Sequence, residues 1–272
     1  MFTILFVLLE AVQFVYFGSI FQKVNSFLIG FFVFGLTVAL SVTWTALYQP
    51  DQIRKALSLP KQLFLINLGA VITFTAYLLS VQLIEPAVVY TISAGTMPIT
   101  AFILNKLGVR EGGGMRNMAE TTGSALIFCS IVFLATITLS GYSGFVRGDI
   151  ATAWIGVLLA IIDGVFFTLI LVYSQRLNHA GVGAEAVLGL RLPLYVVATG
   201  LVVLSGTSTN QTVNATEISI YVAIGFALTV PPLYLLQKAV SLLPTLTISA
   251  LTALGPLVIF VLQNLELSLI HI

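Results

Sequence analysis

Two apolar segments of the same design lie far apart in the chain. They are PAVVYTISAGTMPITAFILNKL at 86–107 and PTLTISALTALGPLVIFVLQNL at 244–265. Adding 158 to the residue number maps Pro86 onto Pro244 and Pro98 onto Pro256. A proline inside a helix removes a backbone N–H and frees a carbonyl, so both segments are predicted to be broken membrane helices. Broken helices at matching places in two halves of a chain are typical of secondary transporters.

The composition indicates a membrane protein. Of the 272 residues 58% are hydrophobic and 8% charged, whereas soluble domains carry roughly 25% charged residues. The lipid bilayer is therefore the expected partner. The formal net charge of +1 gives no indication of nucleic-acid binding. The single Cys129 and the two histidines, His179 and His271, are too few for a disulfide framework or a metal site.

Runs of roughly twenty apolar residues predict nine membrane-spanning helices. They lie at about 2–21, 26–49, 61–84, 86–107, 121–140, 151–173, 185–205, 216–236 and 244–265. The expected fold is an all-α, polytopic membrane helix bundle. The first run begins next to Met1 without a basic region or a small-residue cleavage site. It is therefore expected to be a retained helix and not a signal peptide.

The distribution of Lys and Arg predicts the orientation. With the N-terminus inside, the cytoplasmic loops hold Arg54, Lys55, Lys61, Lys106, Arg110, Arg116, Arg176 and Lys238, and the external loops hold Lys23 and Arg147. The external loop 206–217 contains two Asn-x-Thr triplets, at Asn210 and Asn214. The sequence does not tell whether they are glycosylated. We expect a bacterial cytoplasmic (inner) membrane, where these triplets have no meaning.

The repeat extends beyond the two proline-containing segments. Adding 153 maps Glu10 onto Asp163 and Gln22 onto Gln175, and the third and eighth spans align Thr73 with Thr229 and, after one gap, Tyr77 with Tyr234. Residues 1–140 thus form a first five-helix repeat and residues 151–266 a second. Five is odd, so the second copy is expected to enter the membrane from the opposite side.

The second repeat lacks its last helix in this sequence. A tenth span is expected from the repeat, but the chain ends with LSLIHI at 267–272. This hexapeptide reads like the translated end of a sequencing-library transposon. We therefore expect a non-native tail and a C-terminally truncated second repeat.

The segment LLSVQLIEPAVVYTISAGTMPITAFILNKLGVRE, with Glu111 at its cap, and the segment LLPTLTISALTALGPLVIFVLQNLE, with Glu266, carry a family pattern. Each combines a span entered at a proline, a mid-helix proline and a glutamate after the span. In this the chain resembles the EamA-type branch of the drug/metabolite transporter superfamily. The resemblance implies a ten-helix inner-membrane carrier, often an exporter of metabolites, amino acids or drugs.

Two acidic residues inside predicted spans are the leading functional candidates. At 1.5 Å per residue, Glu10 lies roughly 13 Å along the first helix and Asp163 roughly 18 Å along the sixth. Both are thus expected near the bilayer midplane, where an acid costs about 2.5–3.5 kcal/mol. Burial favours the neutral form of a carboxyl, so the pair could exchange protons for a substrate cation. Gln13, one turn beyond Glu10, is a candidate partner.

Glu10 also resembles, in position, the first-helix glutamate of the small multidrug exporters in the same superfamily. The alternative is that each acid only hydrogen-bonds across a helix interface and fixes the packing.

Further residues are candidates for the substrate path because they are polar or lie at the predicted helix breaks. They are Tyr77, Thr91, Pro98, Tyr234, Ser249, Thr252 and Pro256. The alternative is ordinary use of small and hydroxyl residues for packing in membrane helices. Arg191 lies inside the seventh span, where snorkelling to the cytoplasmic surface is favoured. Its alternative role is a charge partner for Asp163 or for an anionic substrate.

These observations predict a carrier for a small molecule that works by alternating access, with an exporter favoured. Proton coupling through the two acids and facilitated diffusion both fit the sequence. An intramembrane enzyme would need a nucleophile–base or metal constellation, and a channel would need a selectivity-filter loop; neither is recognisable. No nucleotide-binding motif appears, so no cofactor is expected. The sequence indicates neither the substrate nor the oligomeric state.

Overall fold

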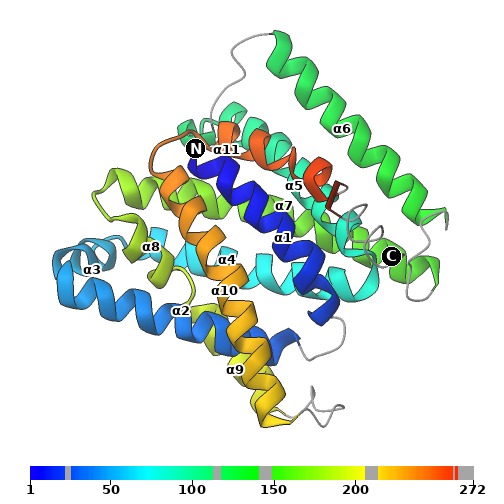
Figure 1. Cartoon of the computed structure of the whole chain (residues 1–272). Helices are drawn as coiled ribbons and strands as arrows, with labels where there is room; N and C mark the ends of the chain where they lie inside the picture. Colours follow the sequence, from blue (N-terminus) through cyan, green and yellow to red (C-terminus); the bar gives the residue numbers. More distant parts are fainter. Residues whose placement is uncertain (22–25, 113–117, 141–148, 206–213, 260, 263–272) are drawn as a thin grey trace.

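The computed structural model describes residues 1–21, 26–112, 118–140, 149–205, 214–259 and 261–262 (Figure 1). This part of the chain is helical, and no β-strand is found among its elements. The elements are α1 Phe2–Phe21, α2 Ser26–Tyr48, α3 Pro50–Leu57, α4 Pro60–Leu83, α5 Pro86–Lys106, η1 Arg110–Gly112, α6 Met118–Leu139, α7 Ile150–His179, α8 Ala184–Leu190, α9 Pro193–Leu204, α10 Ala215–Val240 and α11 Thr245–Thr252.

Six helical segments are long and apolar enough to cross a membrane. They are Ser26–Tyr48, Pro60–Leu83, Pro86–Lys106, Ile150–His179, Ala184–Leu204 and Thr216–Val240. The other three predicted spans contain shorter apolar helices within the described residues, at Phe2–Gln13, Thr122–Ile137 and Thr245–Ile259. The fold is therefore a helix bundle of the kind found in integral multi-pass membrane proteins, and the predicted number of nine spans stays a prediction.

The helix starts follow from proline and capping residues. Proline occupies the first turn of four helices, where its missing N–H costs no hydrogen bond; these are α3, α4, α5 and α9. Asp149 caps α7 by accepting from the backbone N–H of Thr152. Asn214 caps α10 and exchanges hydrogen bonds with Glu217 in a capping box. Asn214 thus has a structural role at the start of a helix.

Prolines 98 and 256 act differently on their helices. The prediction that Pro98 breaks its helix is wrong, because α5 is continuous from Pro86 to Lys106. The second copy is interrupted: α11 ends at Thr252, and the helical backbone resumes at 255–259. Pro98 is buried among neighbouring helices, and such packing allows a membrane helix to continue past a proline.

The seventh predicted span is not one straight helix. It is divided into α8 and α9, with Arg191 and Leu192 between them. Pro193 lacks the N–H that would continue the ladder. The side-chain amide of Asn67 on α4 donates to the carbonyl of Leu190 at 2.7 Å and accepts from the N–H of Leu194 at 3.1 Å. Asn67 therefore satisfies backbone groups on both sides of the break.

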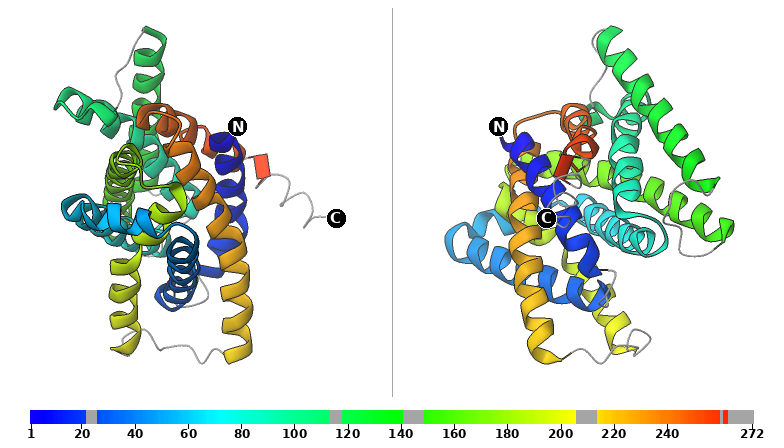
Figure 2. Two further views of the ribbon diagram at one scale, coloured as in Figure 1. Left: turned by 90° about the vertical axis from the view of Figure 1, so that its left-hand side faces the viewer. Right: turned by 45° about the vertical axis from the view of Figure 1, so that its right-hand side comes forward.

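The helices pack around α7, which contacts both α4 and α5 along much of its length. On the other side of the molecule α1 packs along α10, and α2 packs against α8, α9 and α10. The largest buried cluster includes Ile66, Ile170, Val187, Leu192 and Tyr195. Figure 2 shows α6 on the outside of the bundle, where it contacts α5 and α7.

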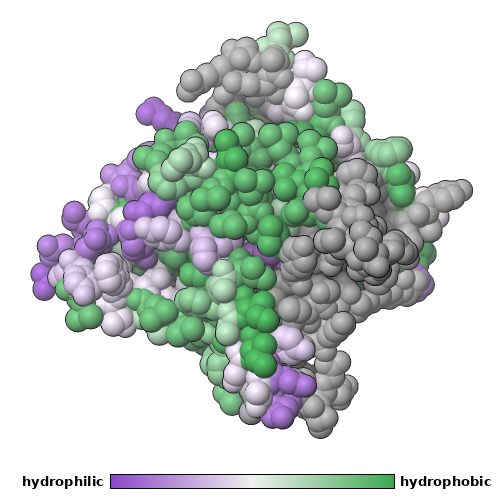
Figure 3. All heavy atoms as spheres, in the orientation of Figure 1, coloured by the Kyte–Doolittle hydropathy of each residue, from purple (hydrophilic) through white to green (hydrophobic). Residues whose placement is uncertain are grey.

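The surface is divided into apolar and polar regions (Figure 3). Large apolar side chains are exposed on several helices, among them Leu40, Phe64, Phe133, Leu158 and Leu201. Such side chains suit contact with lipid tails. Hydrophilic residues gather around α3 and the start of α8.

Several residues discussed in the sequence analysis lie outside the described residues. They are Gln22, Lys23, Arg116, Arg147, Asn210, Glu266 and the tail 267–272.

Candidate functional site

A cavity of about 80 Å³ lies in the centre of the bundle, large enough for several water molecules or a small organic group. It is lined by Glu10, Gln13, Ile29, Gly30, Val33, Phe34, Thr73, Phe74, Tyr77, Leu78, Tyr90, Ser93, Ala94, Met97, Asp163, Phe167, Tyr195, Thr229, Leu233 and Thr252. These residues come from both halves of the chain, so neither half alone forms the central cavity.

The two predicted acids meet in this cavity. The hydroxyl of Tyr90 donates to Oε2 of Glu10 at 2.8 Å, and the hydroxyl of Ser93 donates to Oδ2 of Asp163 at 2.7 Å. Both carboxyl groups line the same cavity. Tyr90 and Ser93 are one helical turn apart on α5. A single face of α5 thus positions an acid from α1 and an acid from α7.

A glycine next to Asp163 permits the close approach of α5 to α7. A Cβ atom on Gly164 would overlap the carbonyl oxygen of Ser93 and lie 2.8 Å from Cβ of Thr96. Two residues on α7 also bond to α5: Asp163 accepts from Ser93, and Thr168 donates to the carbonyl of Met97 at 3.3 Å. The absence of a side chain at position 164 therefore sets the distance across which Ser93 reaches Asp163.

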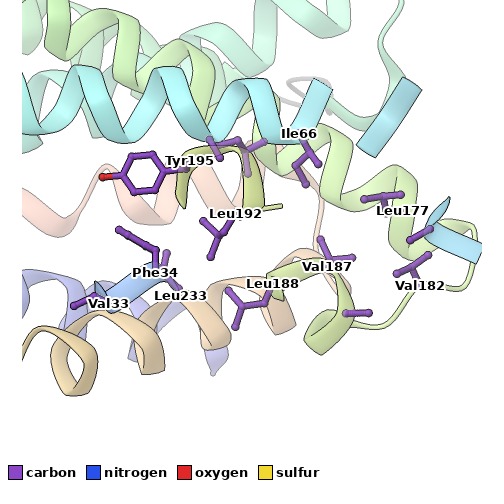
Figure 4. Packing of buried hydrophobic residues seen from close by; sticks show 14 of the residues in the cluster. Val33, Phe34, Ile66, Leu177, Val182, Val187, Leu188, Leu192, Tyr195 and Leu233 are labelled. Carbon is purple, nitrogen blue, oxygen red and sulfur yellow. The ribbon is translucent and has the colours of Figure 1, made fainter. Parts of the chain in front are cut away.

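Three aromatic rings form another part of the cavity lining. The ring centroids of Phe34 and Phe74 lie 4.7 Å apart, those of Phe34 and Tyr195 5.1 Å, and those of Phe74 and Tyr195 5.3 Å. We call these three residues the aromatic wall. Figure 4 shows Phe34 and Tyr195 side by side near Val33 and Leu233. Gly30 makes room for Tyr195, since a Cβ atom there would lie 2.8 Å from the hydroxyl oxygen.

The residues predicted to line the substrate path fall into two groups in the structure. Gln13, Tyr77 and Thr252 line the cavity together with the two acids. Thr91, Pro98, Ser249, Pro256 and Tyr234 are not among its lining residues. The hydroxyl of Thr91 instead donates to the carbonyl of Ala87 at 2.7 Å, and Ser249 is fully buried.

Tyr234 lies next to the start of α8. We call the region around α3 and the start of α8, where hydrophilic residues gather, the polar end of the molecule. The hydroxyl of Tyr234 donates to Oε1 of Glu185 at 3.0 Å, and Nζ of Lys238 lies 2.7 Å from the same oxygen. Glu185 and Lys238 also line a second, polar cavity of about 350 Å³. Tyr77 and Tyr234, although equivalent in the sequence repeat, thus occupy different environments.

Two further contacts at this end connect the halves of the chain. Arg176 binds Glu111 through Nε at 2.9 Å and Nη2 at 3.3 Å. This guanidinium group holds the pKa of the Glu111 carboxyl below its usual range. The side chain of Gln52 on α3 accepts from the backbone N–H of Gly183 at 2.7 Å.

Arg191 lies in the interior, at the break between α8 and α9, with 1% of its surface exposed. The expectation that it snorkels to the surface is therefore wrong. It donates through Nη1 to Oε1 of Gln237 at 3.2 Å. Arg191 is the C-cap residue of α8, so its side chain leaves the backbone at the break, where neighbouring helices bury it. Arg191 does not line the central cavity, which contains Asp163.

The donor set of the central cavity consists of carboxyl, hydroxyl, amide and aromatic groups. In the part of the chain that the structure describes, no three His, Cys, Asp or Glu residues are grouped as metal ligands would be.

Sequence reasoning missed Tyr90, Ser93 and the aromatic wall. A signal for the first two exists: they stand three residues apart in the proline-containing segment 86–107, and this spacing places them on one helix face. No comparable signal exists for the aromatic wall, because the chain contains 19 Phe and 9 Tyr.

Comparison with known proteins supports the fold. A crystal structure of another protein matches with a TM-score of 0.68 and 18% sequence identity, covering 97% of this chain and 86% of that one. At this identity the similarity concerns the fold alone. No protein-family model and no curated protein sequence matches the chain.

Proposed function

We propose that the chain is a secondary transporter that moves a small molecule across the cytoplasmic membrane by alternating access, as an exporter of the EamA type. The observation that carries this proposal is that repeat-equivalent residues from both halves line one central cavity. They are Glu10 with Asp163, Thr73 with Thr229, and Ala94 with Thr252. A binding site at the interface of two repeats is the arrangement on which alternating access depends.

The two prolines support the same location. In a helix, the N–H of residue i bonds the carbonyl of residue i−4. Pro98 inside α5 therefore leaves the carbonyl of Ala94 without its usual donor, and α11 ends at Thr252, ahead of Pro256. Ala94 and Thr252 both line the cavity. Freed carbonyls at membrane depth are tolerated where they face protein or a polar cavity.

The packing of the helices supports two equivalent halves. If α1, α4 and α5 correspond to α7, α10 and α11, each contact has a counterpart. The contact of α4 with α7 matches that of α10 with α1, and the contact of α5 with α7 matches that of α11 with α1. In Figure 1, α1 and α7 also run in opposite directions across the view, as an inverted repeat requires.

The orientation of the proposed transporter follows from its charges. Four basic residues lie in the last turns of helices at the polar end. They are Arg54 and Lys55 of α3, Arg176 of α7 and Lys238 of α10. Because cytoplasmic loops carry an excess of Lys and Arg, we assign this end to the cytoplasm, with the N-terminus inside.

Proton coupling is the proposed energy source. Two carboxyl groups that line one cavity in an apolar bundle favour states in which protons or a bound cation neutralise them. The other titratable groups lining the cavity are the phenols of Tyr77, Tyr90 and Tyr195, which stay neutral at physiological pH. Glu10 and Asp163 are therefore the groups that would release protons when substrate binds and take them up when it leaves.

Transport by purified protein in proteoliposomes tests this proposal. Uptake of a pooled mixture of metabolites and amino acids is measured with and without a pH gradient. The variants are Glu10→Gln, Asp163→Asn and the double variant. Loss of gradient-driven uptake in either single variant supports coupling by the pair. Equal uptake by all variants with and without the gradient indicates facilitated diffusion, and the absence of saturable uptake or counterflow in wild type contradicts a carrier.

A further inference from the structure

The helix α2 presents an exposed apolar stripe that ends in two aromatic rings. Phe32, Leu36, Leu40 and Trp44 follow one another at intervals of four residues, which places them on one helix face. All four are exposed, Leu40 by 53% and Trp44 by 52%. The ring of Trp44 lies 4.2 Å from that of Tyr48. Because exposed Trp and Tyr gather at the level of the lipid head groups, the end of this α2 stripe marks the membrane–water interface.

The short helix α3 begins two residues beyond Tyr48 and holds basic side chains outward. Its inner side is fixed to the bundle: Ala56 is fully buried, and Gln52 accepts from the N–H of Gly183 at 2.7 Å. Arg54 and Lys55 are exposed. Figure 1 shows α3 at the left-hand edge of the molecule, next to the end of α2. The basic side chains therefore lie at the level that the aromatic rings mark.

The charge of this corner is positive. Between 51 and 61 the chain has three basic residues, Arg54, Lys55 and Lys61, and one acid, Asp51. All four are exposed. Arg54 lies 3.7 Å from Asp51, with side-chain exposures of 83% and 81%, and such an exposed pair contributes little. Arg54 can therefore bind another anion as well.

An anionic phospholipid is complementary to this corner in two respects. Its phosphate lies at the interface, where Lys and Arg side chains attract it. Its acyl chains lie deeper, where apolar side chains such as those of the α2 stripe face the hydrocarbon. A solvated helix face would need neither the stripe nor the aromatic rings next to its charges. The order along the chain, apolar stripe, aromatic rings and basic helix, follows the order of the layers of a membrane leaflet.

We propose that the corner of α2 and α3 binds an anionic phospholipid, with the phosphate at Arg54, Lys55 and Lys61 and an acyl chain along the α2 stripe. None of these residues lines the central cavity. The lipid is thus a second partner at the outer surface, and its binding does not depend on the proposed transport.

Quenching of tryptophan fluorescence by brominated lipid tests the proposal. The chain has two Trp, so Trp154→Phe leaves Trp44 as the reporter and Trp44→Phe leaves Trp154. Each variant of the full chain is reconstituted in an equal mixture of phosphatidylglycerol and phosphatidylcholine, with one or the other lipid brominated. At Trp44 we expect phosphatidylglycerol to be preferred about fivefold.

Trp154 is the matched control. It is 50% exposed on α7, and the charged residue nearest to it in the sequence is the acid Asp149. We expect no preference for phosphatidylglycerol at this position. An equal preference at Trp44 and Trp154, or no preference at Trp44, overturns the proposal.

A second comparison locates the phosphate. In the Trp154→Phe background, the triple variant Arg54→Gln, Lys55→Gln and Lys61→Gln is expected to abolish the preference at Trp44. Arg110→Gln removes an exposed basic residue of η1 and is expected to leave the preference unchanged. Equal losses in the two variants would show attraction by the overall surface charge and overturn the local site. If the triple variant does not fold, the comparison of Trp44 with Trp154 still decides.

Free phosphate is distinguished from lipid by competition. Millimolar inorganic phosphate and chloride at the same ionic strength are expected to weaken the preference at Trp44 equally, through screening alone. Abolition of the preference by phosphate and not by chloride would assign the basic residues to a soluble anion and contradict the lipid.

Discussion

Glu111 and Arg176 form a partly buried ion pair, with side-chain exposures of 19% and 33%. Both carboxylate oxygens accept from the guanidinium group, a geometry that makes such pairs stronger than a single contact. Asp51 and Arg54 on α3 form a pair of the same chemistry at 3.7 Å, with exposures of 81% and 83%. The two pairs differ chiefly in exposure and geometry.

We predict that Glu111→Gln lowers the free energy of unfolding by about 1 kcal/mol at pH 7, and that Asp51→Asn has no measurable effect. Because the pKa of Glu111 is lower in the folded chain, its stabilisation is fully present above the unfolded pKa of about 4.3. It is lost as the pH falls through the folded value. Thermal unfolding in detergent between pH 7 and pH 3 checks this. A difference between wild type and Glu111→Gln that does not shrink toward pH 3 would contradict it.

Of the residues of the candidate site, the two acids are more readily predicted from the sequence than the residues around them. Glu10 and Asp163 are conspicuous because an acid inside an apolar span is costly, and the structure places both in one cavity. Tyr90 and Ser93 are inconspicuous because hydroxyl residues are common in membrane helices. The position of Arg191 could not be predicted, because it depends on a helix break that Asn67 stabilises from a distant helix.

The candidate site depends on the close packing of α5 against α7. Ser93 and Thr96 on α5 lie directly against Gly164 on α7. A larger residue at this position would force the two helices apart, because the atoms that it would meet include the backbone carbonyl of Ser93. The hydrogen bond between Ser93 and Asp163 would then be lost.

Gly164→Ala is predicted to destabilise the chain by about 2 kcal/mol or more, in the range expected for overpacking. Gly123→Ala on α6 is the matched control, since nothing lies within 4 Å of a Cβ atom there. In a helix this control is expected to be neutral or to stabilise by up to about 1 kcal/mol. Thermal unfolding of the two variants in the same detergent gives the comparison. Equal unfolding temperatures of the two variants would show that the close contact between α5 and α7 at Gly164 does not contribute to stability.

The positions of the helices follow from the sequence, but their continuity does not. Every predicted span contains helix in the described residues, because long apolar runs have to satisfy their backbone groups internally. A proline, however, breaks one helix and not another: α5 continues through Pro98, whereas α11 ends before Pro256. The outcome depends on packing by neighbouring helices, which the local sequence does not contain.

For the whole molecule, the proposed transport requires that the central cavity opens alternately to the two sides of the membrane. Thr73 on α4 and Thr229 on α10 are buried, with exposures of 1% and 6%, and both line the cavity. If the two halves exchange conformations, each of these positions becomes accessible from both sides in turn.

Cysteine accessibility measures this alternation directly. The single native cysteine is replaced by Cys129→Ser, and Thr73→Cys or Thr229→Cys is introduced into that background. A membrane-impermeant thiol reagent is then applied from one side or the other of reconstituted vesicles of known orientation. If access alternates, each cysteine is labelled from both sides. Labelling of both positions from the same single side only would contradict alternating access.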